Sequence, residues 1–295
     1  MYNIYIYIYE RREKLFYTAD ETLDRFIKED LPYMDLTSLV LDIGGKSGKI
    51  SFTVREQAVI CGSEEVVRII NKLGAETVRF TPSGTNISAG NTFLEARGSS
   101  QCLHMAWKVS MNILEYYSGI ATRTRRLVDK VKAVSPKTEL VATRKLLPGT
   151  KELAIKAVVA GGGLPHRLGL SETILIFKQH LNFMGGMDEL ISRMDDIKAR
   201  ACEKKVLVET ECEADALKLC SAGVDGIQFD KIPPVELGEL VKKLRVINSN
   251  ILLIATGGIN DANVEEYAKT GVNSISTSWI YSGKPVDIGV EINGI

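Results

Sequence analysis

Histidine is scarce in this chain of 295 residues, with three in total, and its five cysteines include no CxxC pair. Structural zinc sites are built mainly from these two residue types, so a zinc site is not expected. The number of cysteines is odd, and unpaired cysteines of this kind are mostly small buried side chains in a reducing compartment. We therefore expect free, mostly buried cysteines and a cytoplasmic protein.

The chain also lacks an excess of charge, because 37 lysine and arginine residues balance 37 aspartate and glutamate residues. Nucleic-acid-binding proteins usually carry a basic excess, so nucleic acid is not an expected partner. A membrane is not expected either, because no apolar run approaches the ~20 residues of a membrane-spanning helix. The opening segment MYNIYIYIYE lacks the cationic start of a signal peptide and is interpreted as an edge strand or a terminal extension.

Three well-known catalytic and nucleotide-binding motifs are missing as well. The chain has no GxSxG elbow, no Walker lysine loop and no GxGxxG after a first strand. Three consecutive glycines at 161–163 follow a predicted helix instead of opening one. We interpret them as a helix stop, not as a phosphate-binding loop.

The N-terminal third of the chain predicts mixed helices and strands. A capping box at 18–21 predicts the start of an amphipathic helix. Alternating apolar residues at 50–54 predict a strand, and 63–73 predicts a second helix. A basic helix over 105–131, which Gly119 could interrupt, would connect two domains.

Beyond Pro136, short apolar runs such as ELVAT, TILIF, KVLVE, GIQFD and ILLIAT alternate with helical segments. Six strands are clear, and LPHR would be a short seventh. This alternation predicts βαβ units and a parallel sheet, as a barrel or a doubly wound fold. A barrel is favoured because polar residues follow so many of the strands, where barrel enzymes keep their active sites.

The residues that follow these strands share a chemistry. They are Arg144, Lys145, Glu209, Asp230, Thr256, Gly257, Gly258 and Ser278. Lysine and arginine bind anionic groups, and paired carboxylates hold a divalent cation or accept hydrogen bonds from sugar hydroxyls. A Thr-Gly-Gly turn with hydroxyls on the next strand matches the usual phosphate site of such barrels. Each residue alone is explained more simply as a solvated loop residue, but together they predict an anion-binding active site.

Several blocks are similar to a known family in their order and spacing. They are SGIATRT (118–124), ATRKLLPGTKELAIKAV (142–158), GGGLPHRLGLSE (161–172), VLVETE (206–211), QFDKI (228–232) and ATGGI (255–259). The chain resembles the quinolinate phosphoribosyltransferase family from EDLPYMDLTS onward. The resemblance is closest to its ModD branch, named for an association with molybdenum transport genes, through blocks such as TSWIYSGKPVDIGVEI.

The resemblance implies a type II phosphoribosyltransferase fold, with an N-terminal α/β sandwich domain over 1–112 and an incomplete α/β barrel over 113–279. Residues 280–295 would pack back on the first domain. It also implies a homodimer or higher homo-oligomer with sites shared between subunits. The implied reaction uses Mg²⁺ and moves phosphoribosyl from phosphoribosyl pyrophosphate to a pyridine nitrogen, followed in the quinolinate enzymes by decarboxylation.

The same resemblance implies roles for individual residues. The catalytic residues would be Lys145, Glu209 and Asp230, with Glu209 and Asp230 also binding the metal. The aromatic acid would be bound by Lys108, Arg144, His166 and Arg167. The ribose phosphate would lie against Thr256, Gly257, Gly258 and Ser278.

The chain departs from the family pattern mainly at the acid end of the site. Lys108 follows Trp107 where the quinolinate enzymes carry Glu-Arg, and Phe177 replaces a substrate-side lysine. Ile254 replaces a glutamate and Pro165 an asparagine. Loss of an arginine and a lysine weakens dicarboxylate binding, since each charged hydrogen bond contributes roughly 1.5–3 kcal/mol.

The sequence therefore predicts a phosphoribosyltransferase that acts on an anionic aromatic heterocycle other than quinolinate. Two alternatives stay open. One is a true quinolinate phosphoribosyltransferase of NAD biosynthesis, and the other is a non-catalytic molybdate-handling protein. Lys145, Glu209 and Asp230 speak against the second, because simple anion capture has no use for paired carboxylates.

Overall fold

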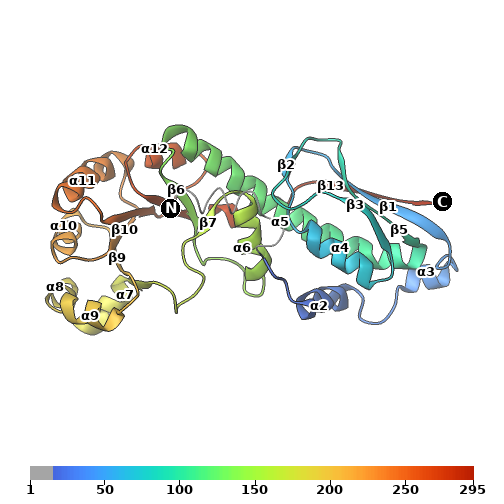
Figure 1. The fold of residues 1–295 in the computed structure, drawn as a ribbon, viewed down its shortest axis with the longest axis horizontal. Helices are drawn as coiled ribbons and strands as arrows, with labels where there is room; N and C mark the ends of the chain where they lie inside the picture. The colour runs from blue at the N-terminus through green and yellow to red at the C-terminus, as the bar shows by residue number, and fades with distance from the viewer. Residues whose placement is uncertain (1–15) are drawn as a thin grey trace. The chain divides into compact units, whose positions relative to one another are not determined.

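The structure is a computed structural model that describes residues 16–295, and it divides into two compact units (Figure 1). Among the described residues, the first unit comprises residues 16–125, Leu147–Gly162 and Tyr281–Ile295. The second comprises Arg126–Leu146 and Gly163–Ile280. The opening segment interpreted as an edge strand or extension lies outside the described residues.

The first unit is built on a four-stranded antiparallel sheet with the order β13-β1-β5-β3. Its strands are β1 (Ser47–Val54), β3 (Glu76–Phe80), β5 (Thr92–Ser99) and β13 (Ile288–Gly294). Ile50, Phe52 and Val54 of β1 are fully buried, which confirms the strand predicted from their alternation. A small second sheet pairs β2 (Ala58–Val59) with β4 (Asn86–Ile87).

Helices complete the first unit. They are α2 (Asp20–Asp30), α3 (Leu36–Val40), α4 (Ser63–Lys72), the larger part of α5 (Ser100–Val134) and α6 (Lys151–Ala160). The predicted capping box of α2 is wrong, because the helix is capped by Ala19 with no side-chain hydrogen bond. The Thr18 hydroxyl instead donates to Glu65 Oε1 at 2.9 Å. Gly119 does not interrupt α5, which is continuous.

The second unit contains a seven-stranded sheet in which the neighbouring strands are parallel. Its strands are β6 (Glu139–Ala142), β7 (Leu164–Pro165), β8 (Ile174–Ile176), β9 (Val206–Thr210), β10 (Gly226–Asp230), β11 (Leu252–Thr256) and β12 (Ser274–Thr277). The order β7-β6-β12-β11-β10-β9-β8 leaves β7 and β8 at the two ends, so the barrel is incomplete. The sheet confirms the predicted α/β fold, including the short strand in LPHR.

Helices cover the outside of this sheet. They are α7 (Lys178–Met184), α8 (Met187–Ser192), α9 (Met194–Ala201), α10 (Glu213–Ser221), α11 (Pro234–Ile247) and α12 (Val264–Ala268). Figure 1 shows α10 and α11 along the outer side of β9 and β10, and α10 contacts both strands. Strands β9 and β10 are mainly apolar and buried, as expected where both faces of a parallel sheet are covered.

The three glycines end a helix, as predicted. Helix α6 stops at Ala160 and is capped by Gly161. Gly162 has a φ of +92°, a backbone conformation that favours glycine. A Cβ on Gly161 would lie 2.5 Å from the carbonyl oxygen of Ala121, so this turn has no room for a side chain.

All five cysteines are free, as predicted. The expectation that most are buried is wrong, because Cys202 and Cys212 are exposed and Cys102 is half-buried. Both exposed cysteines lie at helix ends, where the backbone leaves the packed interior. None of the helices in the described part of the chain has the length and apolar content of a membrane span.

Candidate active site

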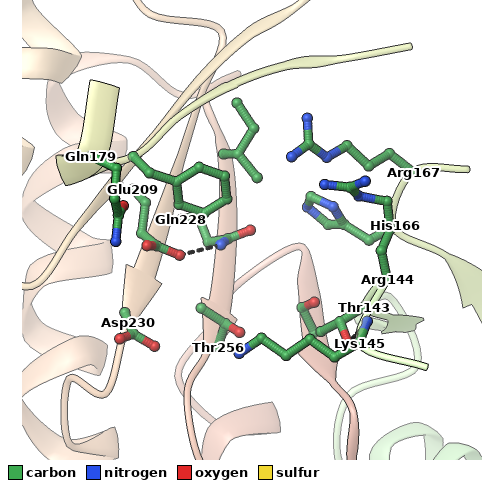
Figure 2. A pocket seen from close by; sticks show the side chains of 13 residues that line it. Thr143, Arg144, Lys145, His166, Arg167, Gln179, Glu209, Gln228, Asp230 and Thr256 are labelled. Carbon is green, nitrogen blue, oxygen red and sulfur yellow. Dashed lines mark hydrogen bonds between the residues drawn. The ribbon is translucent and has the colours of Figure 1, made fainter. Parts of the chain in front are cut away.

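A pocket with a cavity volume of about 400 Å³ lies in the second unit, at the carboxyl ends of the parallel strands (Figure 2). This is where parallel barrels carry their ligand sites. The side chains that line it are Thr143, Arg144, Lys145, His166, Arg167, Leu175, Phe177, Gln179, Glu209, Gln228, Asp230, Thr256 and Ser276.

The parallel register brings the polar lining residues together. Glu209 of β9 pairs with Gln228 of β10, and Asp230 of β10 pairs with Thr256 of β11. Side chains two residues apart on a strand share a face. Gln228 therefore points to the same side as Asp230, and both line the pocket.

Two carboxylates form one wall of the pocket. Glu209 Oε2 accepts a hydrogen bond from Gln228 Nε2 at 2.5 Å. Burial raises the pKa of Glu209, and the nearby Asp230 charge adds to this rise against the opposing hydrogen bond from Gln228. Asp230 Oδ2 lies 3.3 Å from Lys231 Nζ, so an ammonium group stands beside the second carboxylate.

Cationic side chains form the opposite wall. Figure 2 shows Arg144, His166 and Arg167 on one side of the pocket and Glu209 and Asp230 on the other. The Arg167 side chain is 8% exposed, and its Nη1 donates to the carbonyl oxygen of Thr173 at 3.2 Å. This hydrogen bond holds the guanidinium group of Arg167 in place.

The imidazole of His166 is neutral at pH 7. Burial lowers its pKa below the usual value near 6.5, and the positive charges of Arg167 and Arg144 lower it further. Burial and Arg144 also lower the pKa of Arg167, although a guanidinium stays protonated at pH 7. The wall therefore carries two positive charges and one neutral hydrogen-bonding ring.

The two carboxylates have the chemistry of a magnesium site shared with a substrate. Across residues 16–295, no three histidine, cysteine, aspartate or glutamate side chains gather into a metal site. Magnesium is often bound by one or two carboxylates together with substrate phosphates and water. Glu209 and Asp230, on neighbouring strands, fit this donor set.

Most residues predicted for the site lie in this pocket. They are Arg144, Lys145, His166, Arg167, Glu209, Asp230 and Thr256. Gly257, Gly258 and Ser278 follow β11 and β12 directly but are not part of the described lining. Lys108 belongs to the first unit, where its Nζ lies 4.4 Å from the ring centroid of Trp107.

Sequence reasoning from strand ends missed two lining residues in particular, Thr143 and Gln228. Gln228 stands two residues before Asp230, the polar residue at the end of its strand. Alternate positions of a barrel strand face the same side, so this spacing was the signal that could have found Gln228.

The sequence matches two family models. Residues 35–118 match the model described as quinolinate phosphoribosyl transferase, N-terminal domain, and residues 120–291 match that of the C-terminal domain. The chain belongs to the quinolinate phosphoribosyl transferase family. Members of this family are pentosyltransferases, so the resemblance predicted from the sequence blocks is confirmed and the chain is an enzyme of that class.

Relatives fall in two groups by name. A Pasteurella multocida protein that carries the name pyrophosphorylase ModD is 34% identical, covering 94% of this chain and 99% of its own. A Methanothermobacter thermautotrophicus protein that carries the name nicotinate-nucleotide pyrophosphorylase (carboxylating) is 30% identical, covering 93% and 99%. The quinolinate phosphoribosyl transferase family thus includes relatives of both names at similar identity.

Solved structures of the quinolinate phosphoribosyl transferase family have the same fold. Nicotinate-nucleotide pyrophosphorylase from Ehrlichia chaffeensis superposes with a TM-score of 0.85 at 25% identity, covering 94% of this chain and 99% of that chain. NadC from Streptococcus pyogenes has a TM-score of 0.85 at 23% identity, covering 94% and 96%. At 23% identity, the comparison with the Streptococcus pyogenes structure shows only that the fold is shared.

Proposed function

We propose that this enzyme transfers the phosphoribosyl group of phosphoribosyl pyrophosphate to a ring nitrogen of an anionic aromatic heterocycle. The observation that supports this most is the division of charge within one pocket. Glu209 and Asp230 stand on one wall, and Arg144 and Arg167 on the other (Figure 2). Such a pocket fits a substrate pair in which one end develops positive charge and the other carries an acid.

The reaction forms one bond and breaks one bond. The ring nitrogen attacks C1 of the ribose while the bond from C1 to the pyrophosphate oxygen breaks, and pyrophosphate leaves with the electron pair. Positive charge develops at C1, and carboxylates fixed nearby stabilise such charge. In this proposal Glu209 and Asp230 have that role, and the Lys145 ammonium binds the departing phosphate oxygens.

Glu209 and Asp230 would also hold Mg²⁺, together with oxygens of the substrate. When bound, the ion would supply charge neutralisation for the leaving pyrophosphate. The Lys231 ammonium beside Asp230 would have to move aside from the carboxylate oxygen it now faces at 3.3 Å.

The ribose phosphate would bind at the turn after β11. Gly257 and Gly258 both have positive φ, at +90° and +71°. Turns that direct successive backbone N–H groups to one side form anion-binding concavities. The hydroxyls of Thr256 and Ser278 would complete this phosphate site from β11 and the end of β12.

We further propose a homodimer or higher homo-oligomer in which Lys108 of one subunit serves the pocket of another. The Trp107 Nε1 is buried and has no hydrogen-bond partner among the described residues. The resemblance to the ModD branch supports a cellular context in molybdenum transport.

Calorimetric titration with phosphoribosyl pyrophosphate and Mg²⁺ tests the roles of the carboxylates. We expect Glu209→Ala and Asp230→Ala each to lose Mg²⁺-dependent binding by roughly 100-fold, since each removes a charged ligand. Glu211→Ala is the matched control, because Glu211 is an exposed carboxylate outside the described lining. Unchanged binding in both pocket variants, with intact circular dichroism, would contradict the proposed roles.

Pyrophosphate release separates the candidate reactions. Turnover of quinolinate at an ordinary enzyme rate, about 1–10 s⁻¹, would identify a true quinolinate phosphoribosyltransferase. The relative named as a carboxylating pyrophosphorylase supports this alternative. Tight molybdate binding without binding of phosphoribosyl pyrophosphate would instead identify a molybdate-handling protein.

A further inference from the structure

Lys231 directly follows Asp230, at the end of the pocket where the proposed function places phosphoribosyl pyrophosphate, the donor. Its φ is +59°, and neither of the two other non-glycine residues with positive φ in the described chain, Asp42 and Cys202, lines the pocket. Left-handed backbone is strained for a residue with a side chain, and it persists only where the surroundings fix it. Strain of this kind is concentrated at ligand sites, so the side chain of Lys231 is a candidate binding group.

The backbone of Lys231 is fixed on both sides. Its N–H donates to the carbonyl oxygen of Thr256 at 2.9 Å. The next residue, Ile232, is 7% exposed and precedes Pro233, which restricts its backbone to extended conformations. Gly257 lies against the turn, because a Cβ there would stand 2.6 Å from Lys231 Cγ. These contacts hold the start of the Lys231 side chain in one place.

The far end of this side chain is exposed to solvent. The Lys231 side chain is 72% exposed, and its Nζ lies 3.3 Å from Asp230 Oδ2. The Asp230 side chain is 20% exposed and lines the pocket, so the ammonium meets a carboxylate of the pocket from its solvent side. An ion pair with an exposed partner is weak. The contact therefore gives Asp230 a counter-charge without locking the ammonium onto it.

A metal ion in the donor site would separate this pair. An ammonium and a divalent cation on the same carboxylate repel each other, so Lys231 has to leave Asp230 when Glu209 and Asp230 hold Mg²⁺. The neighbouring anion is then the pyrophosphate of the donor, because phosphate oxygens share such an ion with carboxylates. Lys145 is the only lysine among the lining residues, and its side chain points toward Thr256 and Asp230 (Figure 2). A pyrophosphate at this end of the pocket would be bound by two lysines, from the ends of β6 and β10.

We propose that Lys231 binds the pyrophosphate group of the donor, and that Asp230 holds its ammonium in reserve when no metal is bound. The inference rests on the proposed function and adds a residue to the donor site. Lys231 then has two opposite effects. It competes with the divalent cation for Asp230, and it adds a charged hydrogen bond to the pyrophosphate once the cation is in place. A residue with a merely structural role would not have effects of opposite sign.

Two binding measurements on the full-length enzyme separate these effects in Lys231→Met, which removes the ammonium and keeps an unbranched side chain. The first is a titration with Mn²⁺, an oxygen-binding substitute for Mg²⁺, followed by electron paramagnetic resonance. We expect the variant to bind Mn²⁺ roughly two- to fivefold more tightly, the range for loss of an exposed ion pair. The second is a calorimetric titration with inorganic pyrophosphate in excess Mg²⁺. We expect the variant to bind pyrophosphate at least about tenfold more weakly, the ratio for one charged hydrogen bond.

Two further variants identify the cause of these changes. Lys231→Arg keeps a positive charge at the same position and should bind pyrophosphate within about threefold of the wild type. Lys242→Met is the matched control, because the Lys242 side chain is 73% exposed and its Nζ lies 2.6 Å from Glu239 Oε1 on α11, outside the described lining. It should change neither measurement. Far-ultraviolet circular dichroism and thermal melting establish that each variant is folded.

Either change in Lys231→Met without the other would overturn the inference. Tighter Mn²⁺ binding with unchanged pyrophosphate binding would show that Lys231 is only a counter-ion of Asp230. Weaker pyrophosphate binding with unchanged Mn²⁺ binding would show that Asp230 does not hold the ammonium in reserve. A loss of pyrophosphate binding in Lys231→Arg as large as in Lys231→Met would show that the positive charge is not the cause.

Binding of phosphoribosyl pyrophosphate with Mg²⁺, measured on the same preparations, separates failure of the inference from failure of the proposed function. If the wild type binds the donor and Lys231→Met binds it equally well, Lys231 is not a donor residue while the proposed function stands. If the folded wild type does not bind the donor, the proposed function fails, and the inference with it.

Discussion

Gly257 offers a sharp test of how the turn after β11 supports the carboxylate wall. A Cβ at this position would lie 2.4 Å from Asp230 Oδ1, 2.6 Å from Lys231 Cγ and 2.7 Å from the backbone nitrogen of Lys231. A Cβ atom essentially never approaches the backbone nitrogen of a residue distant in the chain so closely, so Gly257→Ala requires the end of β10 to move. Gly258→Ala is the matched control, because a Cβ there meets nothing within 4 Å.

The magnitudes of the two substitutions differ for a reason visible in the structure. Both glycines have positive φ, at +90° and +71°, so alanine at either costs about 1–2 kcal/mol of backbone strain. Gly257→Ala also disturbs the hydrogen bond that the Lys231 N–H donates to the Thr256 carbonyl oxygen at 2.9 Å. Loss of that bond adds about 1 kcal/mol, and displacement of Asp230 falls on ligand binding.

Thermal denaturation and calorimetry together measure both effects. We expect both variants to melt at lower temperature, with Gly257→Ala lower than Gly258→Ala by a further 2–4 °C, roughly the shift for 1 kcal/mol in a domain of this size. Mg²⁺-dependent binding of phosphoribosyl pyrophosphate should weaken by about tenfold or more in Gly257→Ala. In Gly258→Ala it should change by less than about threefold.

Two results would refute this reasoning. Equal losses of binding in the two variants would show that backbone strain, common to both, is the cause. Unchanged binding in Gly257→Ala would show that the carboxylate of Asp230 does not depend on the contact with Gly257.

Three further changes probe other parts of the molecule. Lys156 Nζ lies 2.6 Å from Glu65 Oε2 in the buried part of the first unit. Lys156→Met leaves that carboxylate without its cation and should lower the free energy of unfolding by about 3–5 kcal/mol, part of which Glu65→Gln should restore. A loss below about 1 kcal/mol in thermal unfolding would contradict this. Burial raises the pKa of Glu209, so the wild type loses stability as pH rises through that pKa, and Glu209→Gln does not. The variant should melt at a higher temperature than the wild type at pH 8 and at the same temperature at pH 4; an equal melting temperature at pH 8 would refute this. If subunits share sites, mixing Lys108→Ala and Arg144→Ala subunits should restore about a quarter of wild-type activity, since half of random dimers contain one intact site; no recovery over either parent would exclude shared sites.

Local sequence rules predicted the strands of the second unit because parallel strands buried on both faces are continuous apolar runs. GIQFD is β10 and ILLIAT contains β11, and the polar residues at their ends, Asp230 and Thr256, line the pocket. The end of α6 at Gly161 was also predictable from local sequence, because a helix end often needs a backbone conformation that glycine adopts readily.

Long-range contacts explain what the sequence did not show. Thr18 fits the pattern of a helix cap, but its hydroxyl bonds to Glu65, which is 47 residues away along the chain. Gly119 fits the pattern of a helix break, but a Cβ there would lie 3.2 Å from the Lys284 carbonyl oxygen, so its role is close packing. Phe177, which lines the pocket, likewise packs against Leu207 and Ile254, which belong to two other strands.

The pairing of β1 with β13 sets an order of events during synthesis. Ile50 of β1 pairs with Ile292, and β13 is the edge strand next to β1 in the first sheet. Until the residues of β13 leave the ribosome, β1 has an open edge of unpaired N–H and C=O groups, the kind of edge that promotes association between chains. The first sheet is thus completed only after the strands of the second unit have been made, and a chain that stops before Ile288 should be prone to aggregation.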